Sequence, residues 1–131
     1  MHKQLVPLVF AVLSITATAL RVEAHAFLVH AEPRVGEQSD KVPTEVRVQF
    51  SETVRPGASS IKVFDASGKQ VDKKNTHSDG SNGAVLCVSL VPALTPGTYN
   101  VIWRVTSMNT HVTNGHFRFQ VVGTQPAAAS R

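Results

Sequence analysis

Cysteine is nearly absent from the chain: Cys87 stands alone among 131 residues, so no disulfide can form within it. The lone thiol lies in the apolar run 84–88, and we expect it to be a buried core residue rather than an exposed free thiol. Helical periodicity is missing as well, which argues against a helical fold.

Clusters of basic residues are also lacking. The formal net charge of +4 falls to +3 when Lys3, Arg21 and Glu23 leave with the leading segment, because two positive charges and one negative charge are removed together. The remaining basic residues are scattered, and the aromatic residues fall within expected strands rather than beside them. Nucleic acid is therefore not an expected partner.

The sequence has one long apolar run, residues 5–20, which follows Lys3 and precedes small residues near Ala24. This order is typical of a secretory signal peptide, and the small-residue rule allows cleavage after Ala24 or after Ala26. A retained membrane anchor is the alternative, but the run is shorter than the roughly 20 residues that span a bilayer, and no stop-transfer charges follow it. A lipoprotein is excluded because Cys87 is far from the cleavage region. We expect a soluble exported chain, of 131 − 24 = 107 residues if the cut follows Ala24.

What the chain does have is a set of short runs rich in Val, Ile and Phe, separated by clusters of Pro, Gly, Asn, Asp and Ser, which is typical of an all-β domain. In the clearest run, 45–50, apolar and polar residues alternate, so one face of that strand is expected to be buried. The runs 99–105 and 117–121 alternate in the same way, and we expect them to pair with each other. Further strands are expected at 26–31, 61–64 and 85–90, which gives six or seven in all.

Two polar segments lie outside these runs. We expect 72–82 to be a mobile surface loop, because it is too polar for a buried strand. The end of the chain, 123–131, contains Pro126 and three alanines and is expected to be disordered. No repeat and no second domain are indicated.

Two histidines could carry metal chemistry. If cleavage follows Ala24, His25 becomes the first residue, and its α-amine and imidazole can chelate one metal ion. A second imidazole in the same plane completes the three-nitrogen, tetragonal arrangement that Cu(II) favours, which is known as a histidine brace. His111 lies between two expected strands, where Asn109 could face the same side if the stretch is extended. Taken singly, His25 fits an ordinary residue beside a cleavage site better than a ligand, and His111 fits a solvated or structurally bonded residue as well as a ligand.

The other histidines have weaker claims as ligands. His116 falls outside the inward-facing set of its expected strand, His77 lies in the polar segment, and His30 is next to no obvious donor. We interpret all three as solvated or structural residues. No Gly-x-Ser-x-Gly elbow or other nucleophile motif is present.

Separated motifs along the chain resemble one known family. They are the opening 25–29, Glu32-Pro33 with Gly36, 43–46 with 49–52, 94–99 leading into 101–105, and a Ser-x-Asn-x-His-x-x-x-Gly-x-Phe-x-Phe pattern over 107–119. In this order they resemble the CopC family of periplasmic copper-resistance proteins over essentially the whole exported chain.

The resemblance implies an immunoglobulin-like, Greek-key β-sandwich or barrel of about seven strands, with cleavage after Ala24 and a copper-binding domain over 25–122. It implies that Cu(II) is bound by the amine and imidazole of His25 and by the imidazole of His111. Glu52 matches an acid that lies beside the copper in the family, where it could accept a hydrogen bond or substitute for a ligand. The expected role is that of a monomeric periplasmic carrier or buffer without catalysis, which serves copper resistance or transport and delivers copper to a CopD-like inner-membrane transporter.

The chain departs from the family at Asn109, where an aspartate ligand is usual. An amide oxygen neutralises none of the copper charge, so we expect weaker Cu(II) binding, or replacement of this ligand by water or by Glu52. The methionine-rich Cu(I) site of some members is absent too, because Met108 is the only methionine left after cleavage. Soft ligation of Cu(I) needs several sulfurs, so that function should be lost.

Two other functions compete with the copper carrier. Histidine braces also occur in copper oxygenases that cleave polysaccharides, but the chain is short, and Tyr99 and Trp103 are expected in the core, which leaves no aromatic platform for a glycan. A metal-free, immunoglobulin-like interaction module with vestigial brace residues is the second alternative, because Asn109 replaces the usual aspartate. The copper carrier is the interpretation that we favour.

Overall fold

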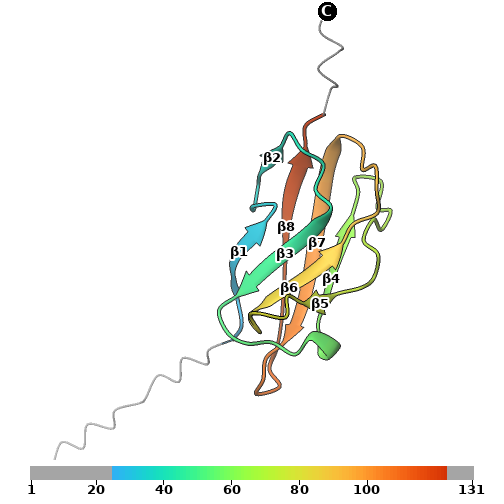
Figure 1. Ribbon diagram of the computed structural model, residues 1–131. Helices are drawn as coiled ribbons and strands as arrows, with labels where there is room; N and C mark the ends of the chain where they lie inside the picture. Colours follow the sequence, from blue (N-terminus) through green and yellow to red (C-terminus); the bar gives the residue numbers. More distant parts are fainter. Residues whose placement is uncertain (1–24, 124–131) are drawn as a thin grey trace, which may run out of the picture.

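The computed structural model describes residues 25–123, which form two β-sheets packed face to face (Figure 1). The strands are β1 (Leu28–Glu32), β2 (Gln38–Ser39), β3 (Glu45–Phe50), β4 (Ser60–Phe64), β5 (His77–Ser78), β6 (Val85–Ser89), β7 (Gly97–Thr106) and β8 (Val112–Val121). A single 3₁₀ turn, η1 (Pro56–Ala58), completes the regular structure of this part of the chain. The expectation of an all-β sandwich is confirmed.

Each sheet has four strands, in the order β1-β3-β6-β5 for the first and β2-β8-β7-β4 for the second. The expected pairing of the two late strands is confirmed, since β7 and β8 form a long antiparallel hairpin in which Tyr99 faces Phe119 and Trp103 faces Gly115. The structure adds β2 and β5 to the strands expected from sequence. Each has only two residues, too few for an alternating pattern to show.

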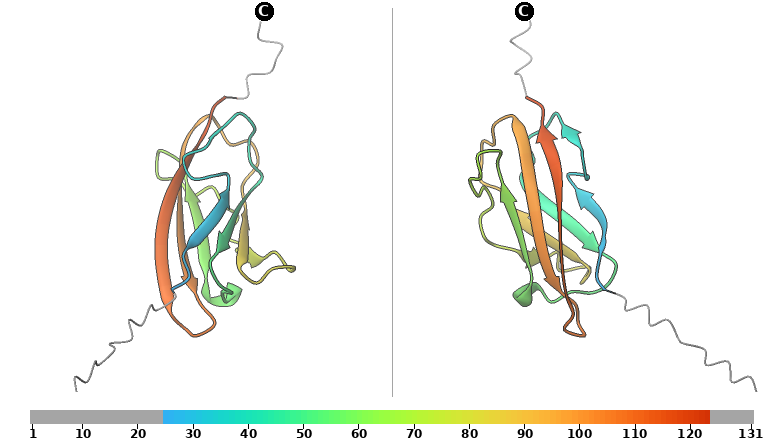
Figure 2. Two further views of the ribbon diagram at one scale, coloured as in Figure 1. Left: turned by 90° about the vertical axis from the view of Figure 1, so that its left-hand side faces the viewer. Right: turned by 180° about the vertical axis from the view of Figure 1, so that it is seen from behind.

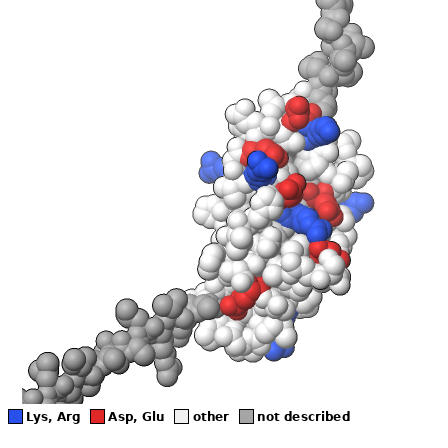
Figure 3. Space-filling model, turned by 60° about the vertical axis from the view of Figure 1, so that its left-hand side comes forward, with Lys and Arg blue, Asp and Glu red and all other residues white. Residues whose placement is uncertain are grey.

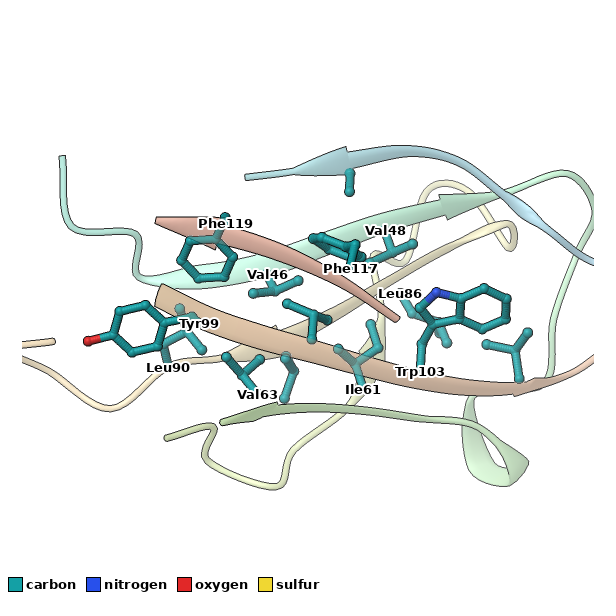
Figure 4. Close-up of a cluster of buried hydrophobic side chains, with 14 of the residues drawn as sticks. Val46, Val48, Ile61, Val63, Leu86, Leu90, Tyr99, Trp103, Phe117 and Phe119 are labelled. Carbon is teal, nitrogen blue, oxygen red and sulfur yellow. The ribbon is translucent and has the colours of Figure 1, made fainter. Parts of the chain in front are cut away.

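The core lies between the two sheets and is filled by every second residue of the long strands (Figure 4). The inward-facing positions predicted for β3, β7 and β8 are confirmed, because these side chains are buried: Val46, Val48, Phe50, Tyr99, Val101, Trp103, Val105, Phe117, Phe119 and Val121. The rings pack in specific pairs, with Phe50 edge-on to Trp103 at a centroid distance of 5.2 Å and Tyr99 stacked on Phe119 at 5.4 Å. Such geometry is favourable for aromatic pairs.

Cys87 is buried as predicted, but it faces away from the core between the sheets. It alternates along β6 with Leu86 and Val88, which belong to that core, and so points to the outer side of its sheet. There the guanidinium of Arg47 covers it and donates a hydrogen bond to its Sγ at 3.4 Å. Burial raises the pKa of the Cys87 thiol, so the thiol stays protonated and unreactive at neutral pH.

The prediction of a mobile loop over 72–82 is wrong in part. Asp72 is 5% exposed, and its carboxylate accepts hydrogen bonds from the backbone N–H groups of Val63 at 2.8 Å and of Lys74 at 3.0 Å. Farther along, β5 pairs with β6. A carboxylate can be buried when backbone N–H groups satisfy it, so a polar segment is held against the sheet without being apolar.

The end of the sandwich where β1 begins also carries the turn between β7 and β8, as all the views show (Figures 1 and 2). The signal peptide and nearly all of the C-terminal segment expected from sequence lie outside the described residues. Within residues 25–123, no helix is long and apolar enough to cross a membrane.

Candidate metal site

The segment that leads into β1 is fixed to the sandwich by backbone hydrogen bonds. The N–H of Phe27 donates to Ser51 Oγ at 3.0 Å, and the N–H of Ser51 donates to the carbonyl of Phe27 at 2.8 Å. The Ser51 hydroxyl also contacts the carbonyl of His25 at 3.4 Å, and the Thr113 hydroxyl donates to the carbonyl of Ala26 at 2.7 Å. Because Ala26 is itself buried, the residue before it, His25, is held near the start of β8.

The turn between β7 and β8 is built around Ser107, which is fully buried. Its N–H donates to the carbonyl of His111 at 2.9 Å, and its carbonyl accepts from the N–H of Thr110 at 3.0 Å. Its hydroxyl oxygen accepts from the N–H of His111 at 3.2 Å. Thr110 adopts a left-handed φ of 68°, which folds the chain back on itself. The stretch is therefore a tight turn and not an extended segment, in which Asn109 and His111 would face the same side.

Asn109 lies at the tip of this turn, and its side chain is engaged within it. The hydroxyl of Ser107 donates a hydrogen bond to Asn109 Oδ1. The amide oxygen, the only atom of this side chain that could act as a metal ligand, thus already accepts a hydrogen bond from a protein donor. The sequence argument that Asn109 and His111 face one ligand rested on an extended backbone, and that geometry does not occur here.

His25 and His111 lie next to each other, although they come from opposite ends of the domain. Their ring centroids are 5.3 Å apart and the ring planes are inclined by 37°. Two imidazoles that ligate one ion through bonds of about 2 Å place their centroids about 4.4 Å apart in a cis arrangement and about 6.2 Å apart in a trans arrangement. The observed separation falls between these values, so it is compatible with two imidazoles that share one ion.

Among the described residues, no third side chain is placed to ligate a metal ion together with His25 and His111. Within residues 25–123, no group of three or more His, Cys, Asp or Glu side chains is close enough to hold a metal ion. Glu52 follows Ser51 and is half-buried, but it does not complete such a group with the two histidines. In the 131-residue chain the nitrogen of His25 is an amide bonded to Ala24, and it becomes an amine only if the chain is cut at that bond.

The remaining histidines of residues 25–123 have other contacts or surroundings than this pair. His30 contacts the carboxylate of Glu32 at 3.1 Å, and Nδ1 of His77 contacts the carbonyl of Asn75 at 2.6 Å. His116 is exposed on the outer face of β8.

Sequence reasoning missed the residues that support the site. Ser51 and Ser107 belong to the motifs 49–52 and 107–119, so their positions could have suggested that they support the site. Arg55 gave no such signal, although its guanidinium donates to the carbonyl of Met108 at 2.8 Å and its N–H to the carbonyl of Thr106 at 2.8 Å. These contacts hold the turn against the segment that follows β3.

A β-sandwich with two facing histidines at one end has the form of a small metal-binding domain. Residues 28–122 match the protein family described as the CopC domain. The chain therefore belongs to the CopC family, and the resemblance stated from the motifs is confirmed.

Individual relatives agree with this membership. The chain is 32% identical to Protein YobA of Escherichia coli K12 over 111 residues, which cover 85% of this chain and 90% of YobA. Among solved structures, CopC from Methylosinus trichosporium OB3b matches with a TM-score of 0.69 and 32% identity, over 75% of this chain and 94% of that one. PcoC from E. coli, described as a methionine-rich copper resistance protein, matches with a TM-score of 0.64 and 25% identity, over 75% and 99% of the two chains. The family is thus one of copper-resistance proteins.

Proposed function

We propose that the exported chain begins at His25 and is a periplasmic carrier or buffer for Cu(II), without catalytic activity. The observation that carries the proposal is the adjacency of the His25 and His111 rings at 5.3 Å. The copper ion is the cargo of this protein, and the family's association with copper resistance supports that assignment.

Cleavage after Ala24 would add the donor that the side chains do not supply. The new α-amine of His25 and its imidazole would close a chelate ring, and the imidazole of His111 would provide the third nitrogen. Cu(II) favours such a tetragonal nitrogen set over other divalent ions. The fixed position of Ala26 and Phe27 supports this scheme, because the hydrogen bonds on both residues hold the segment that directly follows His25 against the sandwich.

The exposed position of the site suits a protein that delivers copper better than one that encloses it. His25 is exposed and His111 only half-buried, so a bound ion would lie at the surface, where an acceptor can approach it. The acceptor that we propose is a CopD-like transporter of the inner membrane. Asn109, engaged with Ser107, would contribute little to the copper, and water or Glu52 would occupy the remaining position.

The decisive experiment uses the protein recovered after export. Intact mass spectrometry reports the terminus, and electron paramagnetic resonance with one equivalent of Cu(II) reports the ligands. We expect a chain that begins at His25 and a tetragonal spectrum dominated by nitrogen. A chain that begins at Phe27 would lack the brace and overturn the proposal. A correct terminus with no copper bound would favour the metal-free interaction module instead.

Two histidine variants locate the ion. Trp103 is the only tryptophan, and it lies on β7 three residues before the strand ends at Thr106, so Cu(II) at the histidine pair should quench its fluorescence. His111→Ala should lower the Cu(II) affinity measured by this titration at least about tenfold, as expected when one of three nitrogen ligands is lost. His116→Ala removes an exposed imidazole from the neighbouring strand and should leave the titration unchanged. Equal Cu(II) affinities of the two variants would show that the copper does not bind at the pair of His25 and His111.

A further inference from the structure

The outward-facing positions of β4, β7 and β8 carry basic side chains and no acidic ones. Lys62 of β4, Arg104 of β7 and Arg118 of β8 all point outward, because they alternate with buried core residues, and all three are exposed. We call this surface the basic face. None of the strands β2, β4, β7 and β8 contains an aspartate or a glutamate.

The register brings these cations together. Lys62 pairs with Ile102, which in turn pairs with His116, while Arg104 and Arg118 occupy the rows on either side of this one. Neighbouring strands are about 4.8 Å apart and alternate residues on a strand about 6.8 Å apart. The three backbone positions therefore fall within about 15 Å of one another on one face of the sheet.

The three cations form no ion pair with the carboxylates of residues 25–123. The opposite sheet differs, because there Arg47 is paired with Asp79 and His30 with Glu32. On the side of the molecule drawn in Figure 3, acidic and basic side chains are interspersed.

Nothing in the described part of the chain covers the basic face. Seen from behind, β7, β8 and β4 form the front layer of the molecule (Figure 2). Two aliphatic side chains, Ile102 and Val112, are 46% and 42% exposed on this same face. The face thus combines unpaired cations with exposed apolar groups.

We propose that the basic face docks on an anionic phospholipid surface. Charge complementarity requires an anionic partner, and the three cations lie together on one exposed sheet face, where a surface of anionic headgroups can contact all of them. Exposed aliphatic groups between cations are the combination by which proteins bind at a membrane interface. The proposal goes beyond the copper function and does not depend on it. If both hold, docking would place the β7–β8 turn with His111 beside the membrane, close to a membrane-embedded acceptor.

The test is co-sedimentation of the exported protein with vesicles at low ionic strength. Vesicles of phosphatidylcholine with phosphatidylglycerol should bind it, vesicles of phosphatidylcholine alone should not, and added salt should release it. Each cation near an anionic leaflet contributes about fivefold to partitioning, so the variant Lys62→Gln/Arg104→Gln/Arg118→Gln should bind on the order of a hundredfold more weakly. The matched control, Lys41→Gln/Lys69→Gln/Lys73→Gln, removes the same charge from exposed positions outside the strands and should retain most of the binding.

Other results would overturn the proposal. Equal loss of binding in the two triple variants would mean that net charge alone acts. Absence of sedimentation with the anionic vesicles at low ionic strength would refute docking on lipid, and binding to soluble polyglutamate in its place would assign the face to an acidic protein. The Cu(II) titration of the basic-face variant should match that of the wild type. A protein that binds vesicles but no copper would refute the copper function and leave this inference standing.

Discussion

The indole of Trp103 lies directly over Gly115 on the neighbouring strand. A Cβ atom at residue 115 would come within 2.2 Å of Trp103 Cζ2 and 2.5 Å of Cε2. The indole also packs against the ring of Phe50, with the two ring planes inclined by 69°. Glycine is therefore required at this position by the space that the aromatic core occupies.

We expect Gly115→Ala to lower the free energy of unfolding by about 1–3 kcal/mol, since the added methyl group overpacks a closely packed site. Chemical denaturation monitored by circular dichroism measures this change. Gly57→Ala is the matched control, because a Cβ at residue 57 meets no atom within 4 Å. Equal stability of the two variants would show that the indole moves aside at little cost.

The fold could be predicted from sequence because the long strands alternate apolar and polar residues. In β3, Val46, Val48 and Phe50 are buried and the residues between them are not, and this period alone identifies the strand and its inner face. Such a signal cannot exist in β2 or β5, which have two residues each. Asp72 was misjudged for a different reason: its burial depends on backbone donors supplied by β4, which the local sequence does not reveal.

The candidate site was predicted less completely. Both histidines were named from sequence, but their adjacency depends on contacts between distant segments, such as that of Thr113 with the carbonyl of Ala26. The conformation of the β7–β8 turn was missed, because a left-handed φ at Thr110 is not indicated by that residue type. The hydrogen bond that engages Asn109 follows from this turn and was missed with it.

The α-amine that the proposed cleavage after Ala24 would create at His25 is the basis of the next prediction. One alanine added before His25 converts the amine into an amide and leaves every side chain unchanged. We expect Cu(II) affinity to fall at least about tenfold, because the chelate ring is lost. Competition with a Cu(II) chelator measures the change, and one alanine added at the C-terminus serves as the control. Unchanged affinity in the N-terminally extended protein would show that the amine is not a ligand.

Reduced copper should bind poorly. Met108 is the only methionine after the proposed cleavage, and it is exposed, while the Cys87 thiol is buried under Arg47. Because burial raises the pKa of this thiol, the thiolate that Cu(I) would need is scarce at neutral pH. We therefore expect a Cu(I) chelator to remove reduced copper completely, and a thiol reagent to modify Cys87 only after denaturation. Stoichiometric retention of Cu(I) that is lost in Cys87→Ser would contradict this account.

The hydrogen bond between Ser107 and Asn109 leads to the last prediction. In Asn109→Asp, the new carboxylate has two equivalent oxygens, so one can keep the contact with the Ser107 hydroxyl while the other turns to the copper. The anionic ligand also removes one unit of positive charge from the site. A charge-assisted contact of this kind is worth about 1.5–3 kcal/mol, so Cu(II) affinity should rise by at least about tenfold.

Chelator competition on the wild type and three variants isolates this effect. Asn114→Asp adds the same charge at an exposed position on β8 and should change the affinity little, which separates ligation from general electrostatics. The variant Glu52→Gln tests whether the carboxylate of Glu52 already supplies an anionic contact to the copper. If Asn109→Asp leaves the affinity unchanged while Glu52→Gln lowers it sharply, Glu52 has taken over the anionic role and the site is not weakened at residue 109. Equal gains in Asn109→Asp and Asn114→Asp would instead mean that the Cu(II) affinity depends only on the net charge of the domain. A carboxylate at residue 114 on β8 could not replace a direct bond from residue 109 in the turn to the copper.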